Sequence, residues 1–324
     1  MLEKTLDEFK QQLSWEPTIV NAARWTRPAA SVDVGMGGSH IPPRFLLRAL
    51  PHLNVSIHRD YGLPAIPEFA QTRPMVIAQS YSGNTEETLD GLREALRRSF
   101  PAAAIATGGD LIKEASAAHI PHVIMPKTAI QPRFATGFGV RALLALLGEE
   151  EALQDTAALA SSLDTGACRK VGESLAEKLF GKIPIVYTST QNRTIGYLWK
   201  AIINEGAKIP AFTNAFPELN HNEMNGFAAE GGTRKLSEAA HFVFLRDTAD
   251  DERVAKRMDI AKQLFEARGF SVEDVVLTRE SVWRMLFEAM LTAGWLGLAL
   301  ATRYGVEPEQ VPMVEEFKKL MRSP

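Results

Sequence analysis

Apolar and polar positions alternate along this chain in a way that predicts strands and helices in turn. Short, almost continuous apolar runs are typical of strands that are buried on both faces of a sheet. Such runs lie at Ser31–Val34, Val55–His58, Met75–Ala78, Ala102–Ala106 and His122–Ile124. Between most of them the apolar residues recur at helical spacing, as they do in Leu89–Leu96. Strands alternating with helices predict parallel βαβ units with helices on both faces of the sheet.

The alternation resumes in the second half, after a charged segment near Gly148–Gly166 that we interpret as a domain link. The elements predicted there are strand Ile183–Tyr187, helix Thr194–Glu205, a short strand near Ala211, strand His241–Leu245, helix Asp251–Arg268, strand Val275–Leu277 and helix Val282–Tyr304. We therefore predict two doubly wound α/β domains, residues 1–150 and 151–324, each a parallel sheet flanked by helices.

Composition narrows the class of protein. The 324 residues are 45% apolar and carry a net charge of −3 without a basic cluster, which argues against a nucleic-acid partner. A single cysteine, Cys168, excludes an intrachain disulfide and a cysteine metal site, and it suits the reducing cytoplasm. The first residues are charged and helical in pattern, unlike a signal peptide. The most apolar stretch, Met290–Ala301, is too short to span a bilayer and predicts a buried helix.

Hydroxyl side chains gather where the run Met75–Ala78 ends and the next helical pattern begins. Ser80, Ser82, Thr85 and Thr88 all lie in this turn. A helix N-terminus offers free N–H groups and a partial positive charge, so hydroxyls there suit a phosphate without requiring a lysine. Ordinary helix capping is the alternative, and it accounts for one or two of the hydroxyls.

A glycine turn, Gly35-Met36-Gly37-Gly38-Ser39, follows the run Ser31–Val34. Glycines let the backbone approach a ligand closely. The dinucleotide fingerprint would require a glycine where this chain has His40, and the P-loop lysine is also missing. The turn is therefore a ligand-binding candidate, but not a nucleotide loop.

These two turns, in this order and at this spacing, resemble the sugar isomerase (SIS) domain, which binds phosphosugars. Further motifs are Thr107-Gly108-Gly109, Pro126–Arg133, Asn204–Lys208 and Pro217–Glu223. Together they resemble the bifunctional phosphoglucose/phosphomannose isomerase family over nearly the whole chain. The resemblance implies two SIS domains, a phosphorylated hexose substrate, a homodimer with shared active sites, and no cofactor, metal or membrane partner. It also implies isomerisation of glucose 6-phosphate, and of mannose 6-phosphate, to fructose 6-phosphate through a cis-enediol(ate).

The resemblance assigns the catalytic roles. Glu205 is the base that moves the proton between C1 and C2, Arg133 stabilises the enediolate, and His221 opens the sugar ring. The residues alone leave plainer interpretations open. Glu205 could be a surface glutamate before Gly206, a natural C-cap. Arg133 could be a loop arginine that bonds a helix C-terminus, and His221 could be a structural histidine.

The carboxylates next to His221 have no assigned role. Glu218 and Glu223 flank it as orienting groups or as surface acids. The pair His221-x-Glu223 has no third ligand at a suitable spacing, which argues against a metal site.

By resemblance, Ser80, Ser82 and Thr85 hold the phosphate. Gly37, Gly38 and Ser39 lie near the sugar, and so does Lys318 on a predicted terminal helix, Pro312–Leu320. A solvated lysine on an amphipathic helix is the alternative for Lys318. The chain departs from the family at His40, where a small residue is common. It also departs at Val311, where some bifunctional members carry a threonine; this bears on the tolerance for both epimers and not on the isomerase chemistry.

Two other classes stay open. A non-catalytic phosphosugar sensor would keep the Ser82 and Thr85 turn but would not need Glu205, Arg133 and His221 together, and it would usually carry a DNA-binding segment. Another SIS enzyme, such as a phosphoheptose isomerase or a phosphosugar lyase, is the second. The two-domain length and the combination of Asn204-Glu205 with His221 argue against it.

Overall fold

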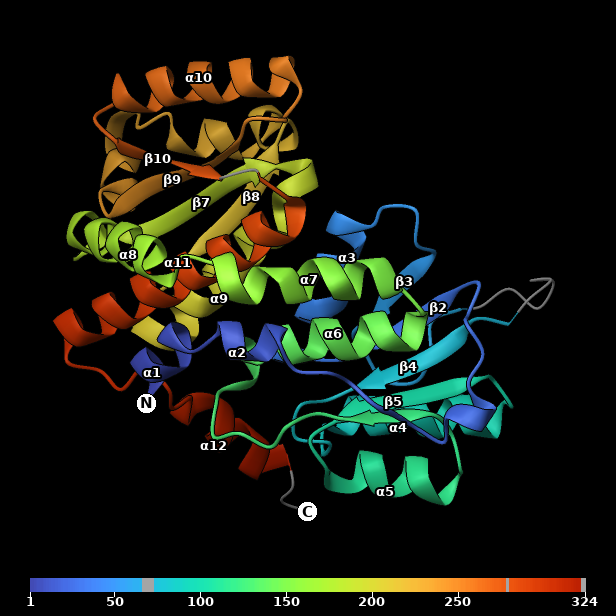
Figure 1. The fold of residues 1–324 in the computed structure, drawn as a ribbon. Helices are drawn as coiled ribbons and strands as arrows, with labels where there is room; N and C mark the ends of the chain where they lie inside the picture. Colours follow the sequence, from blue (N-terminus) through green and yellow to red (C-terminus); the bar gives the residue numbers. More distant parts are fainter. Residues whose placement is uncertain (66–72, 278–279, 322–324) are drawn as a thin grey trace. The chain divides into compact units, whose positions relative to one another are not determined.

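The computed structural model describes residues 1–65, 73–277 and 280–321, and it divides into two compact units (Figure 1). The N-terminal unit comprises Asp7–Leu163 with Met1, and the C-terminal unit comprises Asp164–Pro324 with Leu2–Leu6. The division falls inside the segment that we interpreted as a link, but after residue 150, where the sequence placed it. Helix α7 (Glu150–Ser162) belongs to the N-terminal unit because it packs against α2 (Lys10–Leu13) and α6 (Thr136–Leu147).

The N-terminal unit is built on a six-stranded sheet with the strand order β1-β6-β5-β4-β2-β3. The strands are β1 (Ile19–Val20), β2 (Ser31–Val34), β3 (Val55–His58), β4 (Met75–Gln79), β5 (Ala102–Ala106) and β6 (His122–Ile124). All pairings are parallel except that of β1 with β6. The five predicted strands are therefore confirmed, and the antiparallel edge strand β1 is an addition.

Helices cover both faces of this sheet. They are α3 (Ile41–Ala49), α4 (Glu86–Arg97), α5 (Gly109–Ala117), α6 and α7, with 3₁₀ turns η1 (Ala22–Arg24), η2 (Gly37–His40) and η3 (Pro132–Phe134). Figure 1 shows α4 and α5 on one side of the sheet and α6 on the other. Val32 and Val34 alternate with Asp33 along β2 and point into the core under α4, where Leu89 and Leu92 meet them. This is the predicted doubly wound arrangement.

The C-terminal unit has a four-stranded, wholly parallel sheet in the order β10-β9-β7-β8. The strands are β7 (Ile183–Ser189), β8 (Phe212–Phe216), β9 (Ala240–Asp247) and β10 (Ser271–Leu277). The helices are α8 (Thr165–Leu179), α9 (Arg193–Ala207), α10 (Glu252–Glu266), α11 (Val282–Tyr304) and α12 (Pro312–Met321), and α1 (Leu2–Asp7) adds Leu2–Leu6. The 3₁₀ turns are η4 (Thr190–Asn192), η5 (Glu218–His221), η6 (Glu223–Phe227) and η7 (Gly231–Ser237).

Helix α11 is long and apolar enough to cross a membrane by length and composition, but 78% of its apolar window is buried inside the fold. It packs against α8 and α9. The prediction of a buried helix over residues 290–301 is thus confirmed.

Aromatic rings fill the other face of the C-terminal sheet. Tyr187 on β7 is fully buried among Phe216, Phe242 and Phe244, with ring centroids 5.5–5.9 Å away. Phe265 of α10 stacks on Phe242 with 4.1 Å between centroids. Because so many rings surround it, the position of Tyr187 is fixed by packing on several sides.

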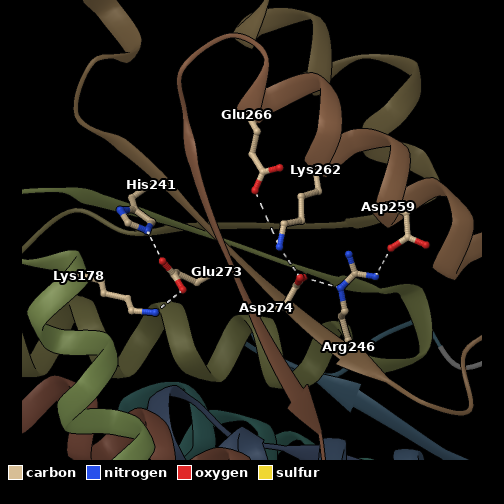
Figure 2. Close-up of polar contacts among 8 residues, drawn as sticks. All are labelled: Lys178, His241, Arg246, Asp259, Lys262, Glu266, Glu273 and Asp274. Atoms are coloured by element: carbon tan, nitrogen blue, oxygen red, sulfur yellow. Dashed lines mark hydrogen bonds and ion pairs between the residues drawn. The ribbon is translucent and has the colours of Figure 1, made fainter.

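Ion pairs tie strand β10 to the helices on both faces of the sheet (Figure 2). Neighbouring residues of a strand point to opposite faces. Glu273 accordingly pairs with Lys178 of α8 at 2.7 Å, whereas Asp274 pairs with Lys262 of α10 at 2.7 Å and with Arg246 of β9 at 2.5 Å. These pairs hold the far edge of the sheet, on the side away from β8.

Candidate active site

Three turns of the N-terminal unit meet at the carboxyl ends of β2, β4 and β5. The backbone N–H of Tyr81, after β4, donates to Oγ of Ser39, after β2, at 3.0 Å. The hydroxyl of Thr107, after β5, donates to the carbonyl oxygen of Tyr81 at 2.8 Å. Gly83 lies so close to Gly108 that an added Cβ would sit 1.8 Å from its carbonyl oxygen. The carboxyl edge of a parallel sheet is where such folds bind ligands.

The three hydroxyls predicted to hold phosphate lie together at the start of α4. Ser80 Oγ and Thr85 Oγ1 are 2.8 Å apart, and Ser80 Oγ and Ser82 Oγ are 3.5 Å apart. Ser80 is buried, Thr85 is half-buried and Ser82 is exposed. Thr85 occupies the N-cap position of α4 but makes no capping hydrogen bond. Helix capping therefore does not account for this group.

The glycine turn after β2 packs directly on the loop that carries Arg133. A Cβ added to Gly38 would lie 2.6 Å from the backbone N of Arg133 and 2.6 Å from the carbonyl carbon of Pro132. Arg133 is 4% exposed, and its guanidinium lies 5.2 Å from the ring centroid of Phe134. The fold thus brings Arg133, far away in the sequence, beside the glycine turn.

His40 ends the same turn and is buried. Burial first, and then the positive charges of Arg44 and Arg59, lower the pKa of His40 to about 4. The imidazole is therefore neutral near pH 7. Its place in the fold is the start of α3, directly after the residues predicted to lie near the sugar.

In the C-terminal unit, Glu205 lies in the last turn of α9 and is half-buried. The expectation that Gly206 caps this helix is wrong: the helix continues to Ala207, and Lys208 at φ +59° is the C-cap. Gly206 instead faces Gly297 of α11.

Two side chains of the same motif close the end of α9. The side-chain amide of Asn204 donates to the carbonyl oxygen of Ile209 at 2.8 Å, and the ammonium of Lys208 donates to the backbone carbonyl oxygen of Glu205. The residues around Glu205 therefore fix the helix end that carries it.

His221 and Glu223 have different surroundings. His221 ends η5 and is exposed, while Leu219 beneath it is fully buried. Glu223 accepts hydrogen bonds from the hydroxyl of Tyr187 at 2.6 Å and from the amide of Asn214 at 2.5 Å. Glu218 accepts one from the side chain of Asn222 at 2.8 Å.

A cavity of about 400 Å³ opens beside Glu223, around the free edge of the C-terminal sheet. It is lined by Ile185, Tyr197, Lys200, Phe212, Thr213, Glu223 and Phe227. Glu223 therefore lines this cavity together with residues of β7 and β8.

Comparison with known proteins places the chain in a family. The bifunctional phosphoglucose/phosphomannose isomerase of Aquifex aeolicus is 32% identical over 328 residues, covering 98% of each chain. This chain belongs to the bifunctional phosphoglucose/phosphomannose isomerase family. The protein of that name from Caldicellulosiruptor bescii is 33% identical over 305 residues, covering 89% of this chain and 88% of its own. A family model described as "Bacterial phospho-glucose isomerase C-terminal SIS domain" matches residues 169–321.

The likeness to solved structures concerns the fold. A glucosamine-6-phosphate deaminase from Thermotoga maritima superposes with a TM-score of 0.69 at 15% identity, covering 96% of each chain. The prediction of an α/β protein with SIS-type parallel sheets is thereby confirmed for this member of the isomerase family.

The terminal helix of this family member forms as predicted, as α12. Lys318 lies on it, exposed, and pairs with Glu315 one turn earlier at 2.8 Å. Val311 is half-buried and directly precedes the helix. Within the described part of the C-terminal unit, Lys318 thus has the surroundings of a solvated lysine.

The expected site residues of this isomerase-family chain fall into two groups. The N-terminal unit brings together Gly37, Gly38, Ser39, Ser80, Ser82, Thr85 and Arg133. The C-terminal unit carries Glu205, His221 and Lys318 on α9, η5 and α12. The sequence analysis missed Tyr187 and Asn214, because nothing in their local sequence signals that Glu223 bonds to them.

Proposed function

We propose that this chain interconverts glucose 6-phosphate and mannose 6-phosphate with fructose 6-phosphate. The single observation that carries the proposal is the cluster of Ser80, Ser82 and Thr85 hydroxyls at the start of α4, beside the turn in which Gly38 packs on Arg133. This arrangement offers hydrogen-bond donors for a phosphate and a cation a short distance away. Membership of the isomerase family supports the choice of hexose phosphates.

The phosphate is bound by the hydroxyl cluster. Ser80 is buried and holds the backbone N–H of Gly83 at 3.1 Å, so the turn keeps its shape before the ligand arrives. Ser82, exposed, and Thr85, half-buried, have hydroxyls at the rim of the cluster. The N-terminus of α4 adds its partial positive charge. Gly37, Gly38 and Ser39 line the adjoining part of the site, where the sugar carbons lie.

The isomerisation moves one carbon-bound proton, from C2 to C1. First, His221 gives a proton to the ring oxygen as the bond between that oxygen and C1 breaks, and the hydroxyl on C1 passes its own proton to water, so the sugar opens to the aldehyde. The carboxylate of Glu205 then takes the proton from C2, and the electron pair moves to the carbonyl oxygen as the enediolate forms. Arg133 stabilises that negative charge. The hydrogen on O2 passes to O1, and Glu205 returns its proton to C1 as the C2 carbonyl forms, which yields the ketose. Lys318 contacts the sugar from α12.

Both epimers reach the same intermediate. Glucose 6-phosphate and mannose 6-phosphate differ only at C2, and removal of the C2 proton gives one enediolate. We propose that glucose 6-phosphate is preferred, because Val311 lacks the hydroxyl that some family members have there.

We propose that the enzyme works as a cytoplasmic homodimer in which His221 serves the partner's site. Closed two-fold dimers are the commonest oligomers. Mixing inactive Glu205→Gln subunits with inactive His221→Ala subunits should restore part of the activity after subunit exchange. Self-contained sites would give no recovery.

The test of the reaction itself is Glu205→Gln. We expect kcat to fall by about 10²–10⁴-fold with a modest change in KM, and solvent deuterium to stop entering the product. Glu266→Gln is a matched control, because Glu266 also lies in the last turn of a helix but outside the site. Near-normal turnover by Glu205→Gln would refute the assignment. If the wild type binds 6-phosphogluconate but converts none of the hexose or heptose phosphates, the chain is a sensor.

A further inference from the structure

We propose that Glu223 is a positioning residue that holds the His221 loop, residues 217–227, against the sheet through Tyr187 and Asn214. The inference rests on the proposed function, since it takes His221 to be the ring-opening group. It goes further by assigning the neighbouring carboxylate a separate task.

The His221 loop has an apolar underside. Leu219 is fully buried, and Met224 and Phe227 pack against the aromatic core that covers this face of the sheet. His221 lies between them in sequence and is exposed. Among the residues that the structure describes, the side chain of His221 makes no hydrogen bond or ion pair. Its position therefore depends on how its neighbours are held.

Glu223, two residues later, holds the loop to two strands at once. One carboxylate oxygen accepts from the hydroxyl of Tyr187 on β7 at 2.6 Å, and the other accepts from the amide of Asn214 on β8 at 2.5 Å. Hydrogen bonds to a charged acceptor are stronger than those between neutral groups. Both oxygens are thus engaged within the C-terminal unit.

Both partners of Glu223 are themselves fixed. Tyr187 is fully buried among phenylalanine rings. Burial first, and then its hydrogen bond to Glu223, raise the pKa of Tyr187 well above its usual value, so the phenol remains a donor. Asn214 is oriented by its own oxygen, which accepts from the backbone N–H of Ala215 at 2.8 Å. The amide nitrogen of Asn214 must therefore face Glu223.

Asn222 completes the turn on the other side of His221. Its oxygen accepts from the backbone N–H of Glu223 at 2.5 Å, and its amide donates to Glu218 at 2.8 Å. The residue directly after His221 is consequently bonded both to Glu223 and to the start of η5. A shift of Glu223 would be transmitted to His221 through this one residue.

The donor pattern allows a reciprocal test. In Glu223→Gln, one of the two acceptor oxygens becomes a donor, so either the amide of Asn214 or the hydroxyl proton of Tyr187 loses its acceptor. In Asn214→Asp, two carboxylates face each other. The double variant Glu223→Gln with Asn214→Asp restores one donor and one acceptor, and the other oxygen of residue 214 can still accept from Ala215.

We expect Glu223→Gln to lower kcat for glucose 6-phosphate by about 10–100-fold, because a displacement near 1 Å costs up to about 10²-fold. KM should change by less than about threefold. Asn214→Asp alone should be at least as impaired, and the double variant should return to within about fivefold of wild type. Binding of 6-phosphogluconate, which is acyclic and needs no ring opening, should be unchanged in all three. Glu230→Gln, an exposed glutamate further along the chain, is the control and should turn over normally.

Two results would overturn the inference: wild-type kcat in Glu223→Gln, or no recovery in a double variant whose thermal unfolding matches wild type. If Glu223→Gln does not fold, Tyr187→Phe decides the matter, since it removes one hydrogen bond and keeps the ring; unchanged kcat would then refute the role. Full activity of His221→Ala is a different outcome, because it would contradict the proposed role of His221 itself.

Discussion

Gly38→Ala probes the contact that brings Arg133 to the glycine turn. The added Cβ would lie 2.6 Å from the backbone N of Arg133, 2.6 Å from the carbonyl carbon of Pro132 and 2.9 Å from Cα of Arg133. Nonbonded atoms relax to about 3.5 Å, so the two segments must separate by roughly 1 Å. The obstructing atoms are backbone, and no flexible side-chain end can move aside instead.

The expected loss follows from that displacement. A misplacement of 1 Å at a reacting centre costs about 10²-fold, so kcat/KM for glucose 6-phosphate should fall by about that factor. Overpacking should also lower stability by about 1–3 kcal/mol. The assay is the initial rate of fructose 6-phosphate formation, measured well below the unfolding midpoint and compared with the affinity for 6-phosphogluconate.

Gly172→Ala separates the loss of stability from the loss of geometry. Its Cβ would meet the backbone N of Leu296 at 2.7 Å and the carbonyl oxygen of Thr292 at 2.8 Å, so the crowding is similar. It lies between α8 and α11, outside the proposed site. We expect a similar fall in the unfolding midpoint with normal turnover. The reasoning is refuted if Gly38→Ala keeps kcat/KM within about threefold of wild type, or if both variants lose activity equally.

Three further predictions follow from single features. Because the pKa of His40 is about 4 in the fold and 6.5 in the unfolded chain, the unfolded state binds more protons between these values, and stability falls as the pH falls through this window. Between pH 7 and pH 4, the free energy of unfolding measured by urea titration should fall by about 3 kcal/mol less in His40→Gln than in wild type. An equal fall in the two proteins would contradict this. Ser82→Ala with Thr85→Ala should raise KM strongly, since each bond lost to a charged group is worth about 1.5–3 kcal/mol; normal affinity for 6-phosphogluconate would place the phosphate elsewhere. Val311→Thr should shift the ratio of kcat/KM values toward mannose 6-phosphate by a few-fold to about tenfold, and an unchanged ratio would mean that position 311 does not face the sugar.

Strands of the sheet interiors were predictable because burial on both faces demands continuous apolar residues. The interior strands β2, β5 and β6 begin and end at the predicted residues, and β4 is one residue longer. The edge strand β3 was also predicted with its bounds, but the edge strands β1 and β8 were not. β8 carries exposed and half-buried residues over most of its length, so its pattern is weak and its position came out one residue too early. β1 has only two residues, which is too few for any pattern.

The candidate site also has features that the sequence predicted and features that it did not. Ser80, Ser82 and Thr85 are close in sequence, so their gathering at one turn was predictable from the strand and helix on either side. The contact of Gly38 with Arg133 depends on how α6 and η3 pack, and no local sequence carries that information. Gly206 does not cap the helix, because the helix continues to Ala207 and the side chain of Lys208 donates to the carbonyl oxygens of Glu205 and Gly206.

In each motif, the proposed reactive side chain stands beside residues that only hold it. Asn204 and Lys208 close the helix end at Glu205, and Glu223 anchors the loop of His221. A protein that merely bound a phosphosugar would not need His221 in a fixed position, because no proton has to be delivered to a defined atom. The bonds that hold Glu223 therefore add to the case for an enzyme that Glu205, Arg133 and His221 make together. It follows that replacing Asn214 or Glu223 should lower turnover and leave the binding of 6-phosphogluconate unchanged, and this separation is the behaviour that a binding module could not show.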